Sequence, residues 1–199
     1  MIAVILAAGL SKRFGGKKLL EKVNNKSMVL HVTDLISSLD FDQRILVYSD
    51  EEVFKEVKAN CKESSKFLFL LNEQAANGLS TSIKLAVKNL RNDKTEDGIM
   101  FFVADQPFID TLTVKRLIEA FHQGKGSIIV PIYGENRGNP VIFSHKWVEQ
   151  LKNLEGDVGG RSIIRQNPEE VWEVPIMDST IGKDIDTKDE YLALHSNDK

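Results

Sequence analysis

The sequence contains little of what a secreted or membrane protein requires. Its single cysteine, Cys61, cannot form a disulfide within the chain, and no second thiol stands at zinc-ligand spacing. The apolar stretch at residues 1–8 is too short to span a bilayer, and its positive charges, Lys12 and Arg13, follow it instead of preceding it. We interpret this stretch as a buried strand and not as a signal peptide, and we expect a cytoplasmic protein with no membrane partner.

Positive charge is not in excess either. The chain has 26 Lys and Arg residues against 29 Asp and Glu residues, which gives a formal net charge of −3. Proteins that bind nucleic acid neutralise its phosphates with clustered basic side chains, so we expect no nucleic-acid partner. The four histidines are scattered without a serine or cysteine partner signal, which leaves a hydrolytic triad without support.

The chain does contain an alternation of apolar segments with two different periods. Short runs rich in β-branched and aromatic residues predict buried strands at residues 2–6, 45–48, 67–71, 99–103 and 128–130. Between these runs, apolar residues three and four positions apart predict amphipathic helices at 32–39, 83–90 and 114–121. With 199 residues and 42% hydrophobic content, the chain is long enough for one domain.

Alternating strands and helices predict right-handed βαβ crossovers and therefore an α/β fold, a three-layer αβα arrangement around a Rossmann-like, mostly parallel sheet. Ligands of such folds bind outside the carboxyl ends of the strands, which here are the loops after Leu6, Leu71 and Val103. After Pro131 glycines interrupt shorter elements. We expect this second part to elaborate the first part and not to form a separate domain.

Polar residues stand where the predicted helices begin. Ser27, Ser80 and Asp110 lie near the starts of the three helices, where a side-chain oxygen can accept hydrogen bonds from free backbone N–H groups. The segment 187–190, Thr-Lys-Asp-Glu, fits a capping box and predicts a last helix through residue 194.

The most informative segment follows the first predicted strand. Small residues at positions 7–9 allow a ligand to approach the backbone, while Arg13, Lys17 and Lys18 supply the charge that a polyphosphate requires. The segment lacks Gly-x-Gly-x-x-Gly, so a nicotinamide oxidoreductase is unsupported, and it lacks the Ser or Thr of a Walker P-loop. It predicts a phosphate-binding loop; the alternative is a glycine-rich turn with solvated lysines.

Two further segments place carboxylates where a metal ion could bind. Asp105 ends an apolar strand, a position from which it could hold Mg²⁺ against a triphosphate, since hard cations prefer oxygen ligands. The alternative for Asp105 is a turn before Pro107. Asp184 and Asp186 alternate around Ile185 and could share one face of an extended segment, or they merely lead into the last helix.

Residues 77–83, Asn-Gly-Leu-Ser-Thr-Ser-Ile, join a loop to a predicted helix. Hydroxyl groups and backbone amides at a helix N-terminus could meet a base, a ribose or a phosphate, which makes Gly78 and Ser80 candidates. Helix capping by Ser80 explains the segment almost as well.

Taken together, these segments resemble the molybdenum cofactor nucleotidyltransferase family, the MobA-like NTP transferases. The signature Leu-Ala-Ala-Gly-x-Ser-x-Arg-x-Gly-x-x-Lys matches at residues 6–9, Ser11, Arg13, Gly15 and Lys18, while Phe14 stands where the family usually has Met. Further similar motifs are Gly-x-x-Ser-Ser-Leu at 78–83 (with Thr81 in place of one Ser), Asp-Gln-Pro at 105–107, Arg-Gly-x-Pro at 137–140, Gly-Asp-x-Gly-x-Arg at 156–161 and Asp-Ile-Asp-Thr at 184–187.

The resemblance implies a nucleotide-diphospho-sugar transferase-like fold in a single NTP-transferase domain over residues 1–199. Residues up to about 125 would form the nucleotide-binding half, and residues from about 126 to 199 the acceptor-binding half. The implied reaction transfers CMP from CTP to molybdopterin or the molybdenum cofactor, with Mg²⁺ as cofactor, and gives molybdopterin cytosine dinucleotide and pyrophosphate. A molybdenum hydroxylase would be a candidate client of that product.

The resemblance also assigns roles to individual residues. The expected catalytic residues are Arg13, Lys18 and Asp105, and the expected metal ligands are Asp105 and Asp186. The expected nucleotide contacts are Leu6, Ala7, Ala8, Gly9, Arg13, Lys18, Gly78 and Ser80. The expected acceptor contacts are Arg137, Asp157 and Arg161, with solvated surface charge as the alternative for the arginines and helix capping as the alternative for Asp157.

Donor and activity have alternatives of their own. In the family, Leu-Ala-Ala-Gly goes with cytidine nucleotides and Leu-Ala-Gly-Gly with guanosine, so Ala8 favours CTP. One methyl group contributes only about 1–3 kcal/mol of discrimination. The alternatives are a related transferase that uses another NTP or another phosphorylated acceptor, and a non-catalytic accessory protein that delivers the cofactor to a molybdenum hydroxylase.

Overall fold

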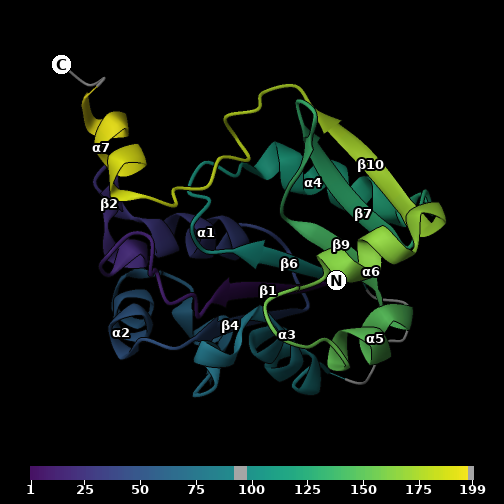
Figure 1. Ribbon diagram of the computed structural model, residues 1–199, viewed down its shortest axis with the longest axis horizontal. Coiled ribbons are helices and arrows are strands. Elements are labelled where there is room, and N and C mark those ends of the chain that lie inside the picture. Colours follow the sequence, from purple (N-terminus) through teal and green to yellow (C-terminus); the bar gives the residue numbers. More distant parts are fainter. Residues whose placement is uncertain (92–97, 197–199) are drawn as a thin grey trace.

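The computed structural model describes residues 1–91 and 98–196, which form a mixed, mostly parallel sheet with helices on both faces (Figure 1). The strand order is β10-β7-β9-β6-β1-β4-β5, and β8 pairs with β7. The strands are β1 (Ile2–Ala7), β4 (Gln43–Tyr48), β5 (Phe67–Leu71), β6 (Gly98–Val103), β7 (Ile128–Tyr133), β8 (Asn136–Arg137), β9 (Val141–Ser144) and β10 (Val171–Ile176). A separate two-stranded ribbon consists of β2 (Lys22–Val23) and β3 (Lys26–Ser27).

All five predicted strands are present, as β1, β4, β5, β6 and β7. The strand β7 continues through Pro131 to Tyr133, so the sequence prediction ended it too early. The strand β10 was not predicted, because it lies at the edge of the sheet and carries exposed Trp172, Glu173 and Pro175 instead of an apolar run. Parallel pairing of β6, β1, β4 and β5 brings their carboxyl ends to the same edge of the sheet.

The helices are α1 (Met28–Ser37), α2 (Glu51–Asn60), α3 (Leu79–Lys88), α4 (Thr111–His122), α5 (Val148–Lys152), α6 (Arg161–Gln166) and α7 (Lys188–Ser196). The three predicted amphipathic helices correspond to α1, α3 and α4, and the predicted last helix is α7. The helix α2 was not predicted, because only Val53 and Val57 of its ten residues are buried and most of its other residues are charged or polar.

Two of the predicted helix caps are wrong. Asp110 does cap α4, accepting a hydrogen bond from the Thr113 N–H at 2.7 Å. Ser27 precedes α1, but its hydroxyl donates to Glu56 at 2.8 Å instead of accepting from the helix. Ser80 lies inside α3, whose N-cap residue is Gly78. The capping box of α7 is confirmed: the Glu190 N–H donates to the Thr187 hydroxyl, and the Thr187 N–H donates to the Glu190 carboxylate.

Two apolar cores cover the two faces of the sheet. Alternate residues of each strand point to opposite faces, so that Ala3 and Ile5 of β1 pack on one side and Ile2 and Val4 on the other. The first core contains buried residues of α1, α2 and α4, and the second contains buried residues of α3, α5 and α6. None of the helices in the described ranges is long and apolar enough to cross a membrane.

The segment after β10 connects the two sides of the molecule. Figure 1 shows it leaving the end of β10 and crossing the edge of the sheet to α7, which lies beside β2. Buried Ile185 of this segment forms a third, small cluster with Phe14, Val23 and Met28, and the Phe14 ring meets the Tyr191 ring edge to face at 5.9 Å. The C-terminal segment is therefore packed against the loop that follows β1.

Candidate active site

A cavity of about 380 Å³ opens at the carboxyl ends of β1 and β6, where a parallel sheet is expected to bind its ligand. Nine of the expected site residues line it: Leu6, Ala8, Gly9, Arg13, Lys18, Gly78, Asp105, Asp157 and Asp186. The other lining residues are Leu10, Ser11, Lys12, Leu19, Ala75, Ala76, Leu79, Ser82, Val103 and Ala104. The wall thus combines the loop after β1, the start of α3, the end of β6 and two segments from the second half of the chain.

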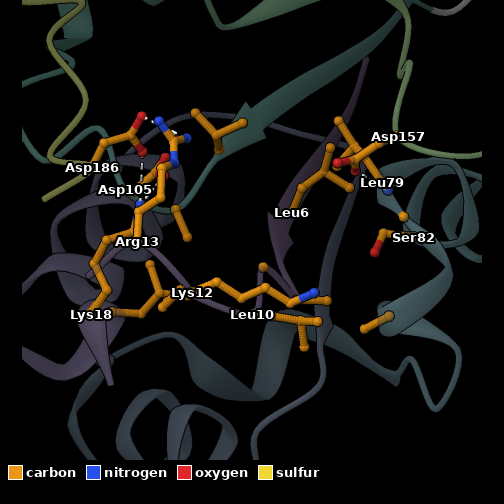
Figure 2. A pocket seen from close by; sticks show the side chains of 18 of the residues that line it. Leu6, Leu10, Lys12, Arg13, Lys18, Leu79, Ser82, Asp105, Asp157 and Asp186 are labelled. Atoms are coloured by element: carbon orange, nitrogen blue, oxygen red, sulfur yellow. Dashed lines mark hydrogen bonds and ion pairs between the residues drawn. The ribbon is translucent and has the colours of Figure 1, made fainter. Parts of the chain in front are cut away.

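One end of the cavity is charged. The Lys18 ammonium contacts both predicted metal ligands, Asp105 at 2.6 Å and Asp186 at 3.2 Å, and Arg13 contacts the other oxygen of Asp186 at 2.9 Å (Figure 2). The Lys18 side chain is only 9% exposed, whereas the Arg13 side chain is 74% exposed. Lys18 is therefore held by the two carboxylates, and Arg13 extends into solvent at the cavity rim.

Backbone contacts between distant segments bring the two carboxylates together. The Ile185 N–H donates to the Asp105 carbonyl at 3.2 Å, and the Gln106 side-chain amide donates to the Gly182 carbonyl at 2.8 Å. The Ile185 side chain is fully buried, which fixes the segment on the end of β6. Since Asp186 follows Ile185 directly, its carboxylate is directed to the same point as that of Asp105.

The start of α7 supports the same arrangement. The Thr187 N–H and next the Asp186 N–H donate to the Glu190 carboxylate, at 2.9 and 2.7 Å, and these bonds lower the pKa of Glu190. Asp184 lies near the same charges: partial burial of its carboxyl group, and next the nearby Asp186 charge, raise the pKa of Asp184. Of the two acidic residues of this segment, only Asp186 lines the cavity.

Lys17, the neighbour of Lys18, faces a different element. Its ammonium pairs with Glu52 in the first turn of α2 and lies 4.0 Å from Asp50. The hydrogen bond to Glu52 is the largest cause of the raised pKa of Lys17. Lys17 is thus engaged on the outer side of the loop, and of these two neighbours Lys18 is the one that lines the cavity.

The opposite end of the cavity is largely apolar. Leu6, Leu79, Ala75 and Ala76 form its wall, and Figure 2 shows Leu79, Ser82 and Asp157 grouped across the cavity from Asp105 and Asp186. Asn72, at the end of β5, donates to the Ser82 hydroxyl at 2.8 Å and to the Thr81 hydroxyl at 2.9 Å. Such a cavity suits an elongated ligand with a charged end and a flat, weakly polar end.

A close contact between two loops forms this apolar end. The Asp157 carboxylate accepts a hydrogen bond from the Leu79 N–H at 3.0 Å, and the Gly156 carbonyl accepts one from the Ser80 N–H at 3.1 Å. Asp157 therefore caps α3 across the fold, although 78 positions separate it from Leu79. Gly78 has φ +104°, and a Cβ atom there would lie 2.5 Å from the Gly156 carbonyl oxygen.

We expect Gly78→Ala to lower the free energy of unfolding by at least about 2 kcal/mol, because alanine meets both backbone strain and a steric clash at this position. Urea denaturation followed by circular dichroism measures this loss. Gly16→Ala is the matched control in the loop after β1: nothing lies within 4 Å of its added Cβ, so its stability should stay within about 0.5 kcal/mol of the parent. Equal stability of the two variants would show that the loop contact at Gly78 is unimportant.

Four of the expected site residues do not line the cavity. Ala7, the last residue of β1, lines a neighbouring cavity instead, and Ser80 is 2% exposed and faces the interior of the protein. Arg137, on β8, pairs with Glu173 of β10 at 2.7 Å, and Arg161 is an exposed residue at the first position of α6. The cavity therefore contains one of the three residues that were expected to contact an acceptor, Asp157.

Sequence reasoning also missed residues that do contribute. Leu79 and Ser82 line the cavity, whereas the predicted Ser80 between them does not. Residues four positions apart share one face of a helix, so Gly78 pointed to position 82 and not to position 80. Asn72 directly follows β5, in one of the three loops that the parallel sheet marks as ligand-binding. Position at a strand end was thus a usable signal, although Asn72 belongs to no motif that the sequence presented.

The geometry at Lys18 tests whether these residues could hold a divalent cation. An ammonium group already lies between the Asp105 and Asp186 carboxylates, so the space between them accommodates positive charge. Among residues 1–91 and 98–196 no cluster of three or more His, Cys, Asp or Glu side chains forms a complete metal cage. Mg²⁺ is commonly bound by one or two carboxylates, while phosphates and water fill its remaining coordination positions. Asp105 and Asp186 therefore fit a Mg²⁺ site.

Known proteins resemble this chain over most of its length. A family model described as a MobA-like NTP transferase domain matches residues 3–171. A probable molybdenum cofactor guanylyltransferase of Thermococcus sibiricus is 26% identical over 155 residues, which are 76% of this chain and 73% of that protein. Another, from Natranaerobius thermophilus, is 32% identical over 130 residues, which are 65% of this chain; the match covers 59% of that protein's length.

The fold has close counterparts among solved structures. The crystal structure of Rv0371c from Mycobacterium tuberculosis H37Rv matches with a TM-score of 0.82 and 27% identity, covering 98% of this chain and 97% of that one. A structure of Rv0371C in complex with manganese matches with a TM-score of 0.77 and 24% identity, covering 97% and 96%. The predicted nucleotide-diphospho-sugar transferase-like fold is confirmed by this likeness.

Proposed function

The chain belongs to the MobA-like NTP transferase family, whose model matches residues 3–171, and from this membership we propose that it transfers CMP from CTP to molybdopterin or the molybdenum cofactor. The products are the cytosine dinucleotide form of the cofactor and pyrophosphate. The observation that carries the proposal is the convergence of Arg13, Lys18, Asp105 and Asp186 at one end of a cavity whose other end is apolar.

The donor nucleotide lies along the cavity in this proposal. Its triphosphate occupies the charged end, where Lys18 and Arg13 neutralise the phosphates and the departing pyrophosphate. The small residues Ala8 and Gly9 allow the backbone after β1 to approach the nucleoside. The base lies between Leu6 and the start of α3, where Ser82 and Asp157 are the polar groups.

Asp105 and Asp186 would hold Mg²⁺, which would neutralise charge on the triphosphate when bound. Their oxygen ligands and the ammonium group already between them support this assignment. The manganese complex of Rv0371C is a parallel for a divalent cation in this fold. When a nucleotide binds, the Lys18 ammonium is free to exchange its carboxylate partners for phosphate oxygens.

The reaction needs no side-chain nucleophile, because the acceptor already carries an anionic phosphate. An oxygen of its terminal phosphate attacks the α-phosphorus of CTP in line, and the bond from that phosphorus to the bridging oxygen breaks as pyrophosphate leaves with the electron pair. The protein's task is to position the two phosphates and to stabilise the charge that develops on the leaving group. Arg13 and Lys18 are placed for the second task.

Arg137 and Arg161 remain our proposal for orienting the acceptor phosphate. Both side chains belong to exposed residues in the second half of the chain, outside the donor cavity. The ion pair of Arg137 with Glu173 is also solvent-exposed and therefore weak, so an arriving phosphate can compete for the guanidinium.

CTP is our proposed donor because of Ala8, which lines the cavity and is 6% exposed. Its methyl group reduces the room beside the base relative to glycine, which disfavours a purine by about 1–3 kcal/mol. The two curated relatives carry the name guanylyltransferase, so GTP is the competing donor. We also propose that the reaction takes place in the cytoplasm and that a molybdenum hydroxylase receives the product.

Pyrophosphate release tests the proposed reaction directly. Purified protein with Mg²⁺ and molybdopterin, or its molybdenum form, is expected to release pyrophosphate with CTP at a rate at least about tenfold above that with GTP, ATP or UTP. Chelation of Mg²⁺ should abolish release. Faster release with GTP would overturn the donor assignment, and nucleotide binding without release from any NTP would favour the accessory protein that delivers cofactor.

A further inference from the structure

One carboxylate oxygen of Asp157, at the apolar end of the cavity, is available to a ligand. Its Oδ1 atom accepts the Leu79 N–H at 3.0 Å, and its Oδ2 atom makes no hydrogen bond to any residue in the described ranges. The residue is exposed to solvent and lines the cavity, and Figure 2 shows it beside Leu79, opposite the charged end. The bond to α3 fixes where the second oxygen is presented.

The chemistry of this oxygen restricts what it can recognise. An ionised carboxylate only accepts hydrogen bonds, so it attracts N–H donors and repels carbonyl oxygens. Cytosine presents an N4 amino group at the position where uracil presents an O4 carbonyl, and guanine and adenine also carry amino groups. The surrounding wall of Leu6, Leu79 and Ala75 is apolar, and the cation that also lines the cavity outside the Lys18 cluster, Lys12, is a hydrogen-bond donor and cannot accept from an amino group.

We infer that Asp157 determines base specificity: it accepts a hydrogen bond from the exocyclic amino group of the donor nucleobase and excludes uracil. The inference rests on the proposed function, since it takes the base to lie at the apolar end when the triphosphate lies at Lys18. Asp157 was expected to contact the acceptor substrate, and the inference assigns it to the nucleotide instead. Asp157 thus caps α3 through one carboxylate oxygen and contacts the base through the other.

The substitution Asp157→Asn reverses the hydrogen-bonding polarity at this position without changing its size. The Leu79 N–H needs an acceptor, so the asparagine carbonyl oxygen takes the place of Oδ1 and the NH₂ group faces the cavity. An NH₂ group repels the N4 amino group of cytosine and donates to the O4 carbonyl of uracil. The ratio of CTP affinity to UTP affinity should therefore fall about 10- to 100-fold, the value of one hydrogen bond to a charged group.

Isothermal titration calorimetry of the full chain with Mg²⁺ and CTP or UTP, without acceptor, measures this ratio. Glu155→Gln is the matched control, because it removes a carboxylate from the same exposed loop at a residue that does not line the cavity. Its ratio should equal that of the parent. A second variant, Asp157→Ser, keeps a capping oxygen but lacks the second one, and it should bind CTP and UTP with nearly equal affinity.

The outcomes separate the inference from the proposed function. A parent protein that prefers CTP over UTP, and loses this preference in both Asp157 variants only, would support the inference. A preference that survives both substitutions would overturn the inference and leave the transferase assignment intact, as would equal binding of CTP and UTP by the parent. Failure of the parent to bind any NTP with Mg²⁺ would overturn the proposed function and this inference together.

Discussion

Asp105→Asn is expected to lower the turnover number for pyrophosphate release by about 1,000-fold or more. The substitution keeps the shape of the side chain but removes the negative charge that, with Asp186, would hold the cation against the triphosphate. The backbone carbonyl of residue 105 can still accept the Ile185 N–H, so the C-terminal segment should stay in place. Steady-state kinetics with CTP and circular dichroism measure the two quantities.

Asp184→Asn provides the control for this prediction. Asp184 belongs to the same acidic segment as Asp186, but it neither contacts Lys18 nor lines the cavity. Its turnover should remain within about tenfold of the parent, because a nearby carboxylate that touches neither Lys18 nor the cavity acts only through its charge on Asp186. Near-normal turnover of Asp105→Asn would remove Asp105 from the active site, and a comparable loss in Asp184→Asn would show that the segment acts through its total charge.

Lys18→Met is expected to lower kcat/KM for CTP by about 100- to 1,000-fold and to strengthen the binding of Mn²⁺ to the nucleotide-free protein. The first effect follows from the loss of a phosphate-binding charge that stabilises the departing pyrophosphate. The second follows from the contacts of Lys18 with Asp105 and Asp186, because a cation must displace the ammonium group to reach both carboxylates. Electron paramagnetic resonance of free Mn²⁺ reports the second effect without any turnover.

The stability of Lys18→Met should depend on metal. Removing one partner of a mostly buried ion pair leaves carboxylates without compensation, which costs about 3 kcal/mol. Added Mg²⁺ should restore part of this free energy of unfolding in the variant but not in the parent. Lys17→Met is the control, because Lys17 pairs with Glu52 on the outer side of the loop. Mn²⁺ binding that is unchanged in Lys18→Met would show that the ammonium group does not compete with the metal.

The sequence alone predicted the layers of the fold and the order of most elements. Apolar runs marked β1, β4, β5, β6 and β7, and the period of three and four residues marked α1, α3 and α4. These signals are local, because the apolar pattern of an element's own residues shows which of its faces are buried. The prediction failed at the edge strand β10 and at the surface helix α2, where few residues are buried. It also failed at the central strand β9, where the buried apolar run of residues 141–143 is too short to mark a strand by itself.

The same division holds for the candidate site. The loop after β1 and the carboxylate after β6 could be selected from the sequence, because a parallel sheet places both at the same edge. The sequence also separated Lys18 from Lys17 by its match to the signature, and the two lysines do lie on different sides of the loop. For Arg137 and Arg161 the motifs offered no position relative to the cavity, and both lie outside its lining.

The sequence by itself determined that this chain forms an α/β sheet with a basic, small-residue loop and an acidic residue at neighbouring strand ends. Only the tertiary structure decided which distant groups meet. It placed Asp186 on Lys18 across 168 positions, and it fixed Asp157 on the start of α3 through a single backbone N–H. Periodicity reports how each element is buried, but contacts between loops depend on the packing of the whole sheet, which no local pattern encodes.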